Sequence, residues 1–154
     1  MEKLIRDNIP EIAEEQGEPI PYRIAGLDEY PLRLVEKVWE ELREFLKDEN
    51  PEEMGDILDV LEAIADDKGW NFQDIVKQAV VTVQSQRDPT WQGILTEAIS
   101  VFMKDPSLVS LSNVVGVLQA VVDGKGWSWT SIEQGRAVKS ALKGKFHARI
   151  IATF

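Results

Sequence analysis

The sequence contains an internal repeat, in which residues 45–75 align with residues 102–132 without any gap. Lys68-Gly69-Trp70 recurs as Lys125-Gly126-Trp127, and Phe45 recurs as Phe102. More than a third of the aligned positions are identical. Neither copy is large enough to bury its own apolar face, so we expect the two copies to pack on one another in a single structure.

The repeated unit has the pattern of helices. Apolar residues recur every three or four positions from Leu34 to Leu46, and Asn50-Pro51 is typical of a helix start. The helix that starts at Asn50-Pro51 is the second of the repeated unit and should end near Gly69. A third helix should run from near Asn71 to Arg87, where Asp88-Pro89 interrupts it. We predict an all-α bundle made of two tandem helical-hairpin repeats, a single-chain pseudo-dimer.

The predicted organisation is one all-α domain over residues 1–154. It consists of a leader (1–29), an acidic repeat (30–87), a degenerate repeat (88–145) and a C-terminal tail (146–154). Pro10, Pro19 and Pro21 predict an irregular leader, apart from a helical turn around Glu11–Gln16. Trp70 and Trp127 are equivalent in the repeat, which favours packing roles at helix corners over stacking on a base.

The composition limits the chemistry that is available. There is no cysteine and His147 is the only histidine, which excludes disulfides, thiolate nucleophiles and multi-histidine metal sites within one chain. The net charge of −10 disfavours general nucleic-acid binding, because that binding depends on neutralised phosphates. No apolar run approaches the roughly 18 residues of a membrane span, and the charged N-terminus differs from a signal peptide. We therefore expect a cytoplasmic protein.

The two copies differ in a set of six acids on the first two helices, since five of these six are absent from the second copy. The acids are Glu40, Glu41, Glu44, Glu53, Asp56 and Asp59, and their counterparts are Glu97, Ala98, Val101, Ser110, Asn113 and Gly116.

Antiparallel packing of the first two helices can bring the edges that carry these acids together. The residues that would converge are Glu41, Glu44, Glu53 and Asp56. Four close carboxylates repel one another unless a cation lies among them, and oxygen ligands suit Mg²⁺, with Mn²⁺ as an alternative. Asp59 is the weakest candidate and could face water. A solvated acidic face remains the alternative for the whole group.

Three segments resemble one known family. The run Glu40-Glu41-Leu42-Arg43-Glu44, followed by Glu53-Met54-Gly55-Asp56, resembles the signature of the MazG-like all-α nucleoside triphosphate pyrophosphohydrolases, a group that includes phosphoribosyl-ATP pyrophosphohydrolases and dimeric dUTPases. Lys3-Leu4-Ile5-Arg6-Asp7-Asn8-Ile9-Pro10 resembles the KLVRDKIP opening of a bacterial and phage branch. Lys143-Gly144-Lys145-Phe146-His147-Ala148-Arg149-Ile150 is similar to the (K/R)GGF-x-x-R-(I/F) ending of that branch.

The resemblance implies Mg²⁺-dependent hydrolysis of a nucleoside triphosphate between its α and β phosphates. By position, the metal ligands would be Glu41, Glu44, Glu53 and Asp56, and the catalytic carboxylates would be Glu40, which orients water, and Glu41. Candidate phosphate contacts are Lys3, Arg6, Lys143, Lys145 and Arg149, although the basic tail could instead contact the acidic helices.

One departure from the family concerns assembly. In the family, the third helix usually leads directly into the C-terminal motif, but here residues 88–138 lie between them. Members of the family commonly form dimers. The second copy would then replace a partner subunit, which predicts one active site per chain and a monomer or weak homo-oligomer. Three alternatives stay open: a phosphoribosyl-ATP pyrophosphohydrolase, a non-catalytic nucleotide-binding module, and a helical adaptor whose acids are solvated.

Overall fold

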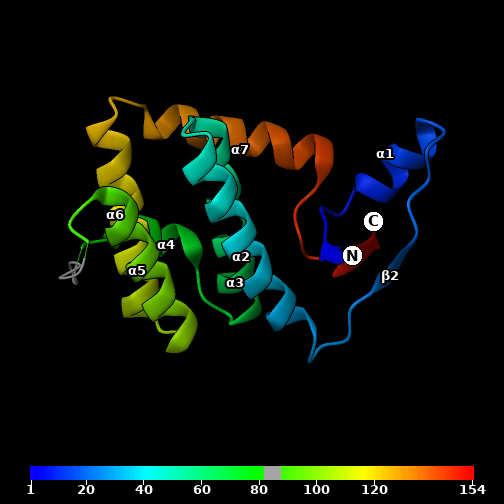
Figure 1. The fold of residues 1–154 in the computed structure, drawn as a ribbon, viewed down its shortest axis with the longest axis horizontal. Coiled ribbons are helices and arrows are strands. Elements are labelled where there is room, and N and C mark those ends of the chain that lie inside the picture. Colours follow the sequence, from blue (N-terminus) through cyan, green and yellow to red (C-terminus); the bar gives the residue numbers. More distant parts are fainter. Residues whose placement is uncertain (82–87) are drawn as a thin grey trace. The chain divides into compact units, whose positions relative to one another are not determined.

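The computed structural model describes residues 1–81 and 88–154, which hold seven helices and three short strands (Figure 1). The fold is mainly helical, as predicted. The helices are α1 (Ile9–Glu15), α2 (Tyr30–Lys47), α3 (Pro51–Asp67), α4 (Phe72–Gln78), α5 (Trp91–Lys104), α6 (Leu108–Gly124) and α7 (Trp129–Lys143), and the strands are β1 (Glu2–Leu4), β2 (Tyr22–Ile24) and β3 (Ile150–Thr153).

The chain divides into two compact units. Unit 1 comprises residues 1–67 and 132–154, and unit 2 comprises residues 68–131. This division does not follow the predicted repeats, because α4 of the first repeat lies in unit 2 and most of α7 of the second repeat lies in unit 1. The packing of the two repeats as a single domain stays a prediction.

Helix boundaries recur in the register of the sequence repeat. The alignment of the two copies carries α3 onto α6, the last residue of α2 onto that of α5, and the first residue of α4 onto that of α7. Within unit 1, α2 packs on α3, and within unit 2, α5 packs on α6. Each unit thus contains one of the two predicted helix pairs, and their origin as tandem repeats stays a prediction.

The third helices pack on the hairpin of the other copy. In unit 2, α4 packs on α6, and Gln119 of α6 donates a hydrogen bond of 3.0 Å to the carbonyl of Val76. In unit 1, α7 lies against α3, where a Cβ on Gly55 would come within 3.2 Å of the Arg136 side chain. The expected third helix over 71–87 is shorter than predicted, since α4 ends at Gln78 and residues 82–87 lie outside the described part of the chain.

The leader is more ordered than predicted. Its β1 and β2 flank β3 from the C-terminal tail in an antiparallel sheet of order β1-β3-β2, with Lys3 opposite Ala152 and Arg23 opposite Ile151. The expectation of an irregular leader is corrected at these two strands, while α1 matches the predicted helical turn. The two termini lie side by side in Figure 1, and the N-terminal amine donates to the Phe154 carbonyl at 3.0 Å.

Apolar packing fixes the two helices that carry the acids. Val38 and Phe45 of α2 and Leu58 of α3 are completely buried. The side-chain oxygen of Asn50 accepts a hydrogen bond of 2.9 Å from the Glu53 N–H, so it caps α3 as the sequence predicts.

In the described part of the chain, no single helix is long and apolar enough to cross a membrane, although α6 and α7 meet that length and composition when taken together as a bent pair.

Candidate functional site

Three of the predicted ligands come together in unit 1. Glu41 of α2 and Glu53 and Asp56 of α3 each place one carboxylate oxygen within 4.8 Å of the other two. Glu53 and Asp56 are one helical turn apart and share one face of α3. All three side chains are partly buried. We call these three residues the carboxylate cluster.

Glu44, the fourth predicted ligand, is exposed and lies outside the cluster. The charge of Glu44 still affects the cluster. The pKa of Glu53 is raised by burial, by the charge of Asp56 and by the charge of Glu44. Glu44 is therefore a neighbour of the cluster in this structure and not one of its three converging members.

The cluster carries electrostatic repulsion. Burial raises the pKa of Glu41, and the charges of Asp56 and Glu40 raise it further, while Lys37 opposes them. Raised pKa values at Glu41 and Glu53 mean that both carboxylates are harder to ionise than in water. A divalent cation would relieve this repulsion, and an all-oxygen donor set fits Mg²⁺ or Mn²⁺.

Three cationic side chains partly neutralise the cluster. The Lys37 ammonium lies 3.4 Å from Glu41. Asp56 accepts from two groups, since its Oδ1 lies 2.7 Å from the Lys139 ammonium and 3.0 Å from the Arg6 guanidinium. The site thus brings positive charge as well as carboxylates to one place, which is the combination that a metal–phosphate complex requires.

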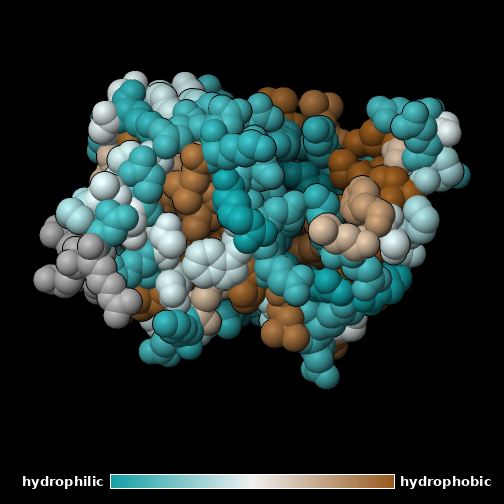
Figure 2. Space-filling model, viewed as in Figure 1, coloured by the Kyte–Doolittle hydropathy of each residue, from teal (hydrophilic) through white to brown (hydrophobic). Residues whose placement is uncertain are grey.

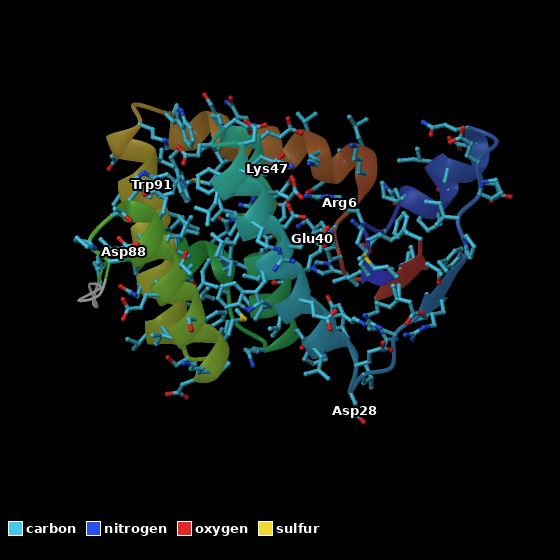
Figure 3. The ribbon with its side chains drawn as sticks, in the orientation of Figure 1. Arg6, Asp28, Glu40, Lys47, Asp88 and Trp91 are labelled. Atoms are coloured by element: carbon cyan, nitrogen blue, oxygen red, sulfur yellow. The ribbon has the colours of Figure 1, made fainter. Side chains whose placement is uncertain are left out.

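Glu40 faces the leader. Its carboxylate accepts from Lys3 at 2.9 Å and from Lys37 at 3.2 Å. Burial alone would raise the pKa of Glu40, but the hydrogen bond from Lys3 and the charge of Lys37 outweigh it and lower that pKa. Figure 3 shows Glu40 and Arg6 on the side of α2 that faces the leader. Glu40 is therefore ionised and held beside the cluster.

Asp59, the weakest of the candidate ligands, does not face water. It is buried, and its two oxygens accept from Arg6 at 2.6 Å and from Arg136 at 2.7 Å. Arg136 also donates to Glu62 at 2.8 Å, and Arg6 donates to the Gly144 carbonyl at 3.0 Å. This buried ion network joins the leader, α3, α7 and Gly144, which follows α7.

The predicted phosphate-binding cations fall into two groups. Lys3, Arg6 and Lys145 pair with acids of α2 and α3, with Lys145 lying 2.9 Å from Glu62. Lys143 is exposed, and Arg149 is partly buried with a positive φ of 57°. Lys3, Arg6 and Lys145 therefore contact the acidic helices. For Lys145, this is the alternative to a phosphate contact that the sequence left open.

Sequence reasoning missed two cations at the cluster. Lys37 lies one helical turn before Glu41, which is the spacing of a helical ion pair and was an available signal. Lys139 belongs to a basic run over 136–149, but nothing local indicated which acid it would meet. The exposed face of α2 seen in Figure 2 is mainly hydrophilic.

The second copy has no room for an acid at the counterpart of Asp59. Asn113, the counterpart of Asp56, is buried. At Gly116, the counterpart of Asp59, a Cβ would lie 2.8 Å from the Val80 carbonyl carbon and 2.9 Å from the Val81 nitrogen. Backbone therefore occupies the space that a side chain would need, and this explains why glycine stands there.

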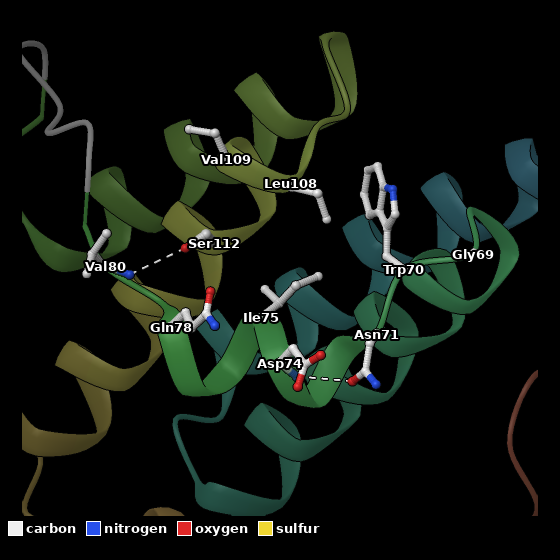
Figure 4. Close-up of a pocket in the computed structure, with 10 residues that line it drawn as sticks. All are labelled: Gly69, Trp70, Asn71, Asp74, Ile75, Gln78, Val80, Leu108, Val109 and Ser112. Atoms are coloured by element: carbon white, nitrogen blue, oxygen red, sulfur yellow. Dashed lines mark hydrogen bonds between the residues drawn. The ribbon is translucent and has the colours of Figure 1, made fainter.

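Unit 2 contains a pocket of about 500 Å³ between α4 and α6 (Figure 4). Trp70 lines it together with Asp74, Leu108, Val109 and Ser112. Trp70 is only partly buried, so it borders this pocket as well as the corner before α4. The pocket is mainly apolar in its walls and carries none of the cluster's acids.

Comparison of the chain with protein-family models, with curated proteins and with solved structures finds no match.

Proposed function

We propose that the chain is a cytoplasmic, Mg²⁺-dependent nucleoside triphosphate pyrophosphohydrolase of the MazG-like kind. It would cleave the α–β phosphoanhydride with water and release a nucleoside monophosphate and pyrophosphate. The observation that carries the proposal is the convergence of Glu41, Glu53 and Asp56, with one oxygen from each within 4.8 Å of the others. The resemblance of the leader, the acidic motif and the tail supplies the reaction class.

The carboxylate cluster would hold the ion, and the resemblance implies Glu44 as a further ligand. When bound, Mg²⁺ neutralises phosphate charge and makes phosphorus more electrophilic. Glu40 is ionised and lies next to the cluster, so it is suited to orient the attacking water. Glu41, the other carboxylate that the resemblance marks as catalytic, would accept the proton that the water loses when its oxygen bonds to phosphorus and pyrophosphate leaves.

The cations near the cluster support a polyanionic substrate. Lys37 and Arg6 are buried and held by acids, so they supply fixed positive charge. Lys143 is exposed and free to move toward a phosphate, and Arg149 lies in the same C-terminal segment. The partial burial of Glu41 and Asp56 weighs against a helical adaptor with a solvated acidic face, since their side chains are 13% and 14% exposed.

The experiment measures pyrophosphate release from a panel of ribo- and deoxyribonucleoside triphosphates and phosphoribosyl-ATP, with and without Mg²⁺. The wild type is compared with Glu41→Gln and with the matched control Glu97→Gln, which removes the counterpart of Glu40 in the second copy. We expect Mg²⁺-dependent release that Glu41→Gln abolishes and Glu97→Gln leaves intact.

The remaining outcomes separate the alternatives. Release from phosphoribosyl-ATP alone would identify that substrate. Thermal stabilisation by a nucleotide with Mg²⁺, but without turnover, would indicate a binding module. Absence of both release and stabilisation would contradict the proposed function. Sedimentation of the wild type would test whether the chain is a monomer or a weak homo-oligomer.

A further inference from the structure

Lys139 of α7 lies against the acids of α3. Its ammonium is 2.7 Å from Oδ1 of Asp56, 3.0 Å from Oδ2 of the same carboxylate and 3.5 Å from Glu52. Its charge also reaches Glu53, whose pKa it helps to hold down against burial and the other acids. The ammonium therefore faces both oxygens through which Asp56 could bind a metal.

These contacts conflict with metal binding at Asp56. A Mg²⁺ ion bound to a carboxylate oxygen lies about 2.0–2.1 Å from it, and two cations that close to one oxygen repel each other strongly. Binding of the ion is therefore more favourable if Lys139 or Arg6 moves away from Asp56.

Lys139 is the cation that can leave. Arg6 is 7% exposed and is also held by Asp59 at 2.6 Å and by the Gly144 carbonyl at 3.0 Å. The Lys139 side chain is 21% exposed, and its contacts in the described structure are with Asp56 and the exposed Glu52. Lysine also carries its charge on a flexible four-carbon chain, whereas the planar guanidinium is fixed by several directed hydrogen bonds.

We propose that Lys139 is an internal counter-ion of the carboxylate cluster, which a divalent cation displaces from Asp56 when it binds. The inference rests on the proposed function, because it assigns a role to Lys139 at the same site. Lys139 then stabilises the metal-free protein and lowers the affinity of the cluster for the metal. Once displaced, its ammonium is released beside a site for phosphate charge.

The test titrates the nucleotide-free, full-length chain with Mn²⁺ and follows the free ion by electron paramagnetic resonance. Lys139→Met should lower the Kd for Mn²⁺ at least tenfold, which corresponds to about 1.4 kcal/mol. Lys139→Arg keeps the charge and should not bind Mn²⁺ more tightly than the wild type. Lys47→Met is the matched control, because it removes the same charge from an exposed position on α2 and should leave the Kd unchanged.

Thermal melting provides a second readout. Mn²⁺ should raise the Tm of Lys139→Met by more than it raises that of the wild type, since the ion then replaces a missing counter-ion. Lys139→Gln should show the same increases in affinity and Tm, and it serves if the methionine variant fails to fold.

Two results would overturn the inference in different ways. If the wild type and Lys139→Met bind Mn²⁺ equally while Glu41→Gln abolishes binding, the metal site stands and Lys139 is not its counter-ion. If neither protein binds Mn²⁺, both the metal site of the proposed function and the role of Lys139 are wrong.

Discussion

Replacing Asp59 with asparagine should destabilise the protein severely. The Asp59 side chain is 5% exposed and binds Arg6 at 2.6 Å and Arg136 at 2.7 Å. Removing one partner from a buried ion pair costs about 3–5 kcal/mol, because the remaining charge stays buried. Arg136 keeps Glu62, and Arg6 keeps its contacts with Asp56 and Gly144, so we expect a value near the lower end, about 3 kcal/mol.

Urea denaturation followed by circular dichroism measures this loss. With an m value of about 2 kcal/mol/M, the midpoint should fall by about 1.5 M. Asp66→Asn is the control, because Asp66 forms an exposed pair with His147 at 3.0 Å and such pairs contribute at most about 1 kcal/mol. Equal midpoints for the two variants would refute the reasoning that burial makes the Asp59 network strong.

Three further predictions concern charge and space. Glu41 has a folded-state pKa above its ordinary 4.5, so it binds protons more tightly when folded and its ionisation costs stability as pH rises through that folded-state value. Without divalent ions, Glu41→Gln should therefore be more stable than the wild type at pH 7, with the gain disappearing toward pH 4.5 in urea titrations. Gly116→Ala should cost about 1–3 kcal/mol by the same assay, because its Cβ meets the backbone of Val80 and Val81. Gly135→Ala, at an exposed position in α7 with open space around it, should instead raise stability by about 0.5–1 kcal/mol, and a loss there would contradict the steric argument.

The local signals in the sequence were sufficient to predict the helical fold and the start of α3, although α4 ends earlier than predicted, at Gln78. Asn50 and Pro51 marked the start of α3, which begins at Pro51 with the Asn50 cap in place. The register of the internal repeat then located α6 from α3. These features depend on neighbours along the chain, and so a single sequence carries them.

Features that depend on distant pairing were not predictable in this way. The strands β1 and β2 are very short and exist because β3, at the far end of the chain, lies between them. For the same reason the sequence did not indicate that Asp59 is buried, since its two arginine partners come from the leader and from α7. The convergence of Glu41, Glu53 and Asp56 was predictable because one short connection joins the two helices that carry them.

Unit 1 is built from two separate segments of the chain, and this determines when its acidic and basic side chains can pair during synthesis. Unit 2 is continuous over residues 68–131, whereas unit 1 needs residues 1–67 and 132–154 together. A growing chain that has reached residue 131 already carries Asp56 and Asp59 but has made neither Arg136 nor Lys139. Its acidic helices therefore lack these two cations until residues 132–154 emerge. Unit 2 can fold during that interval, and unit 1 closes around its own acids last.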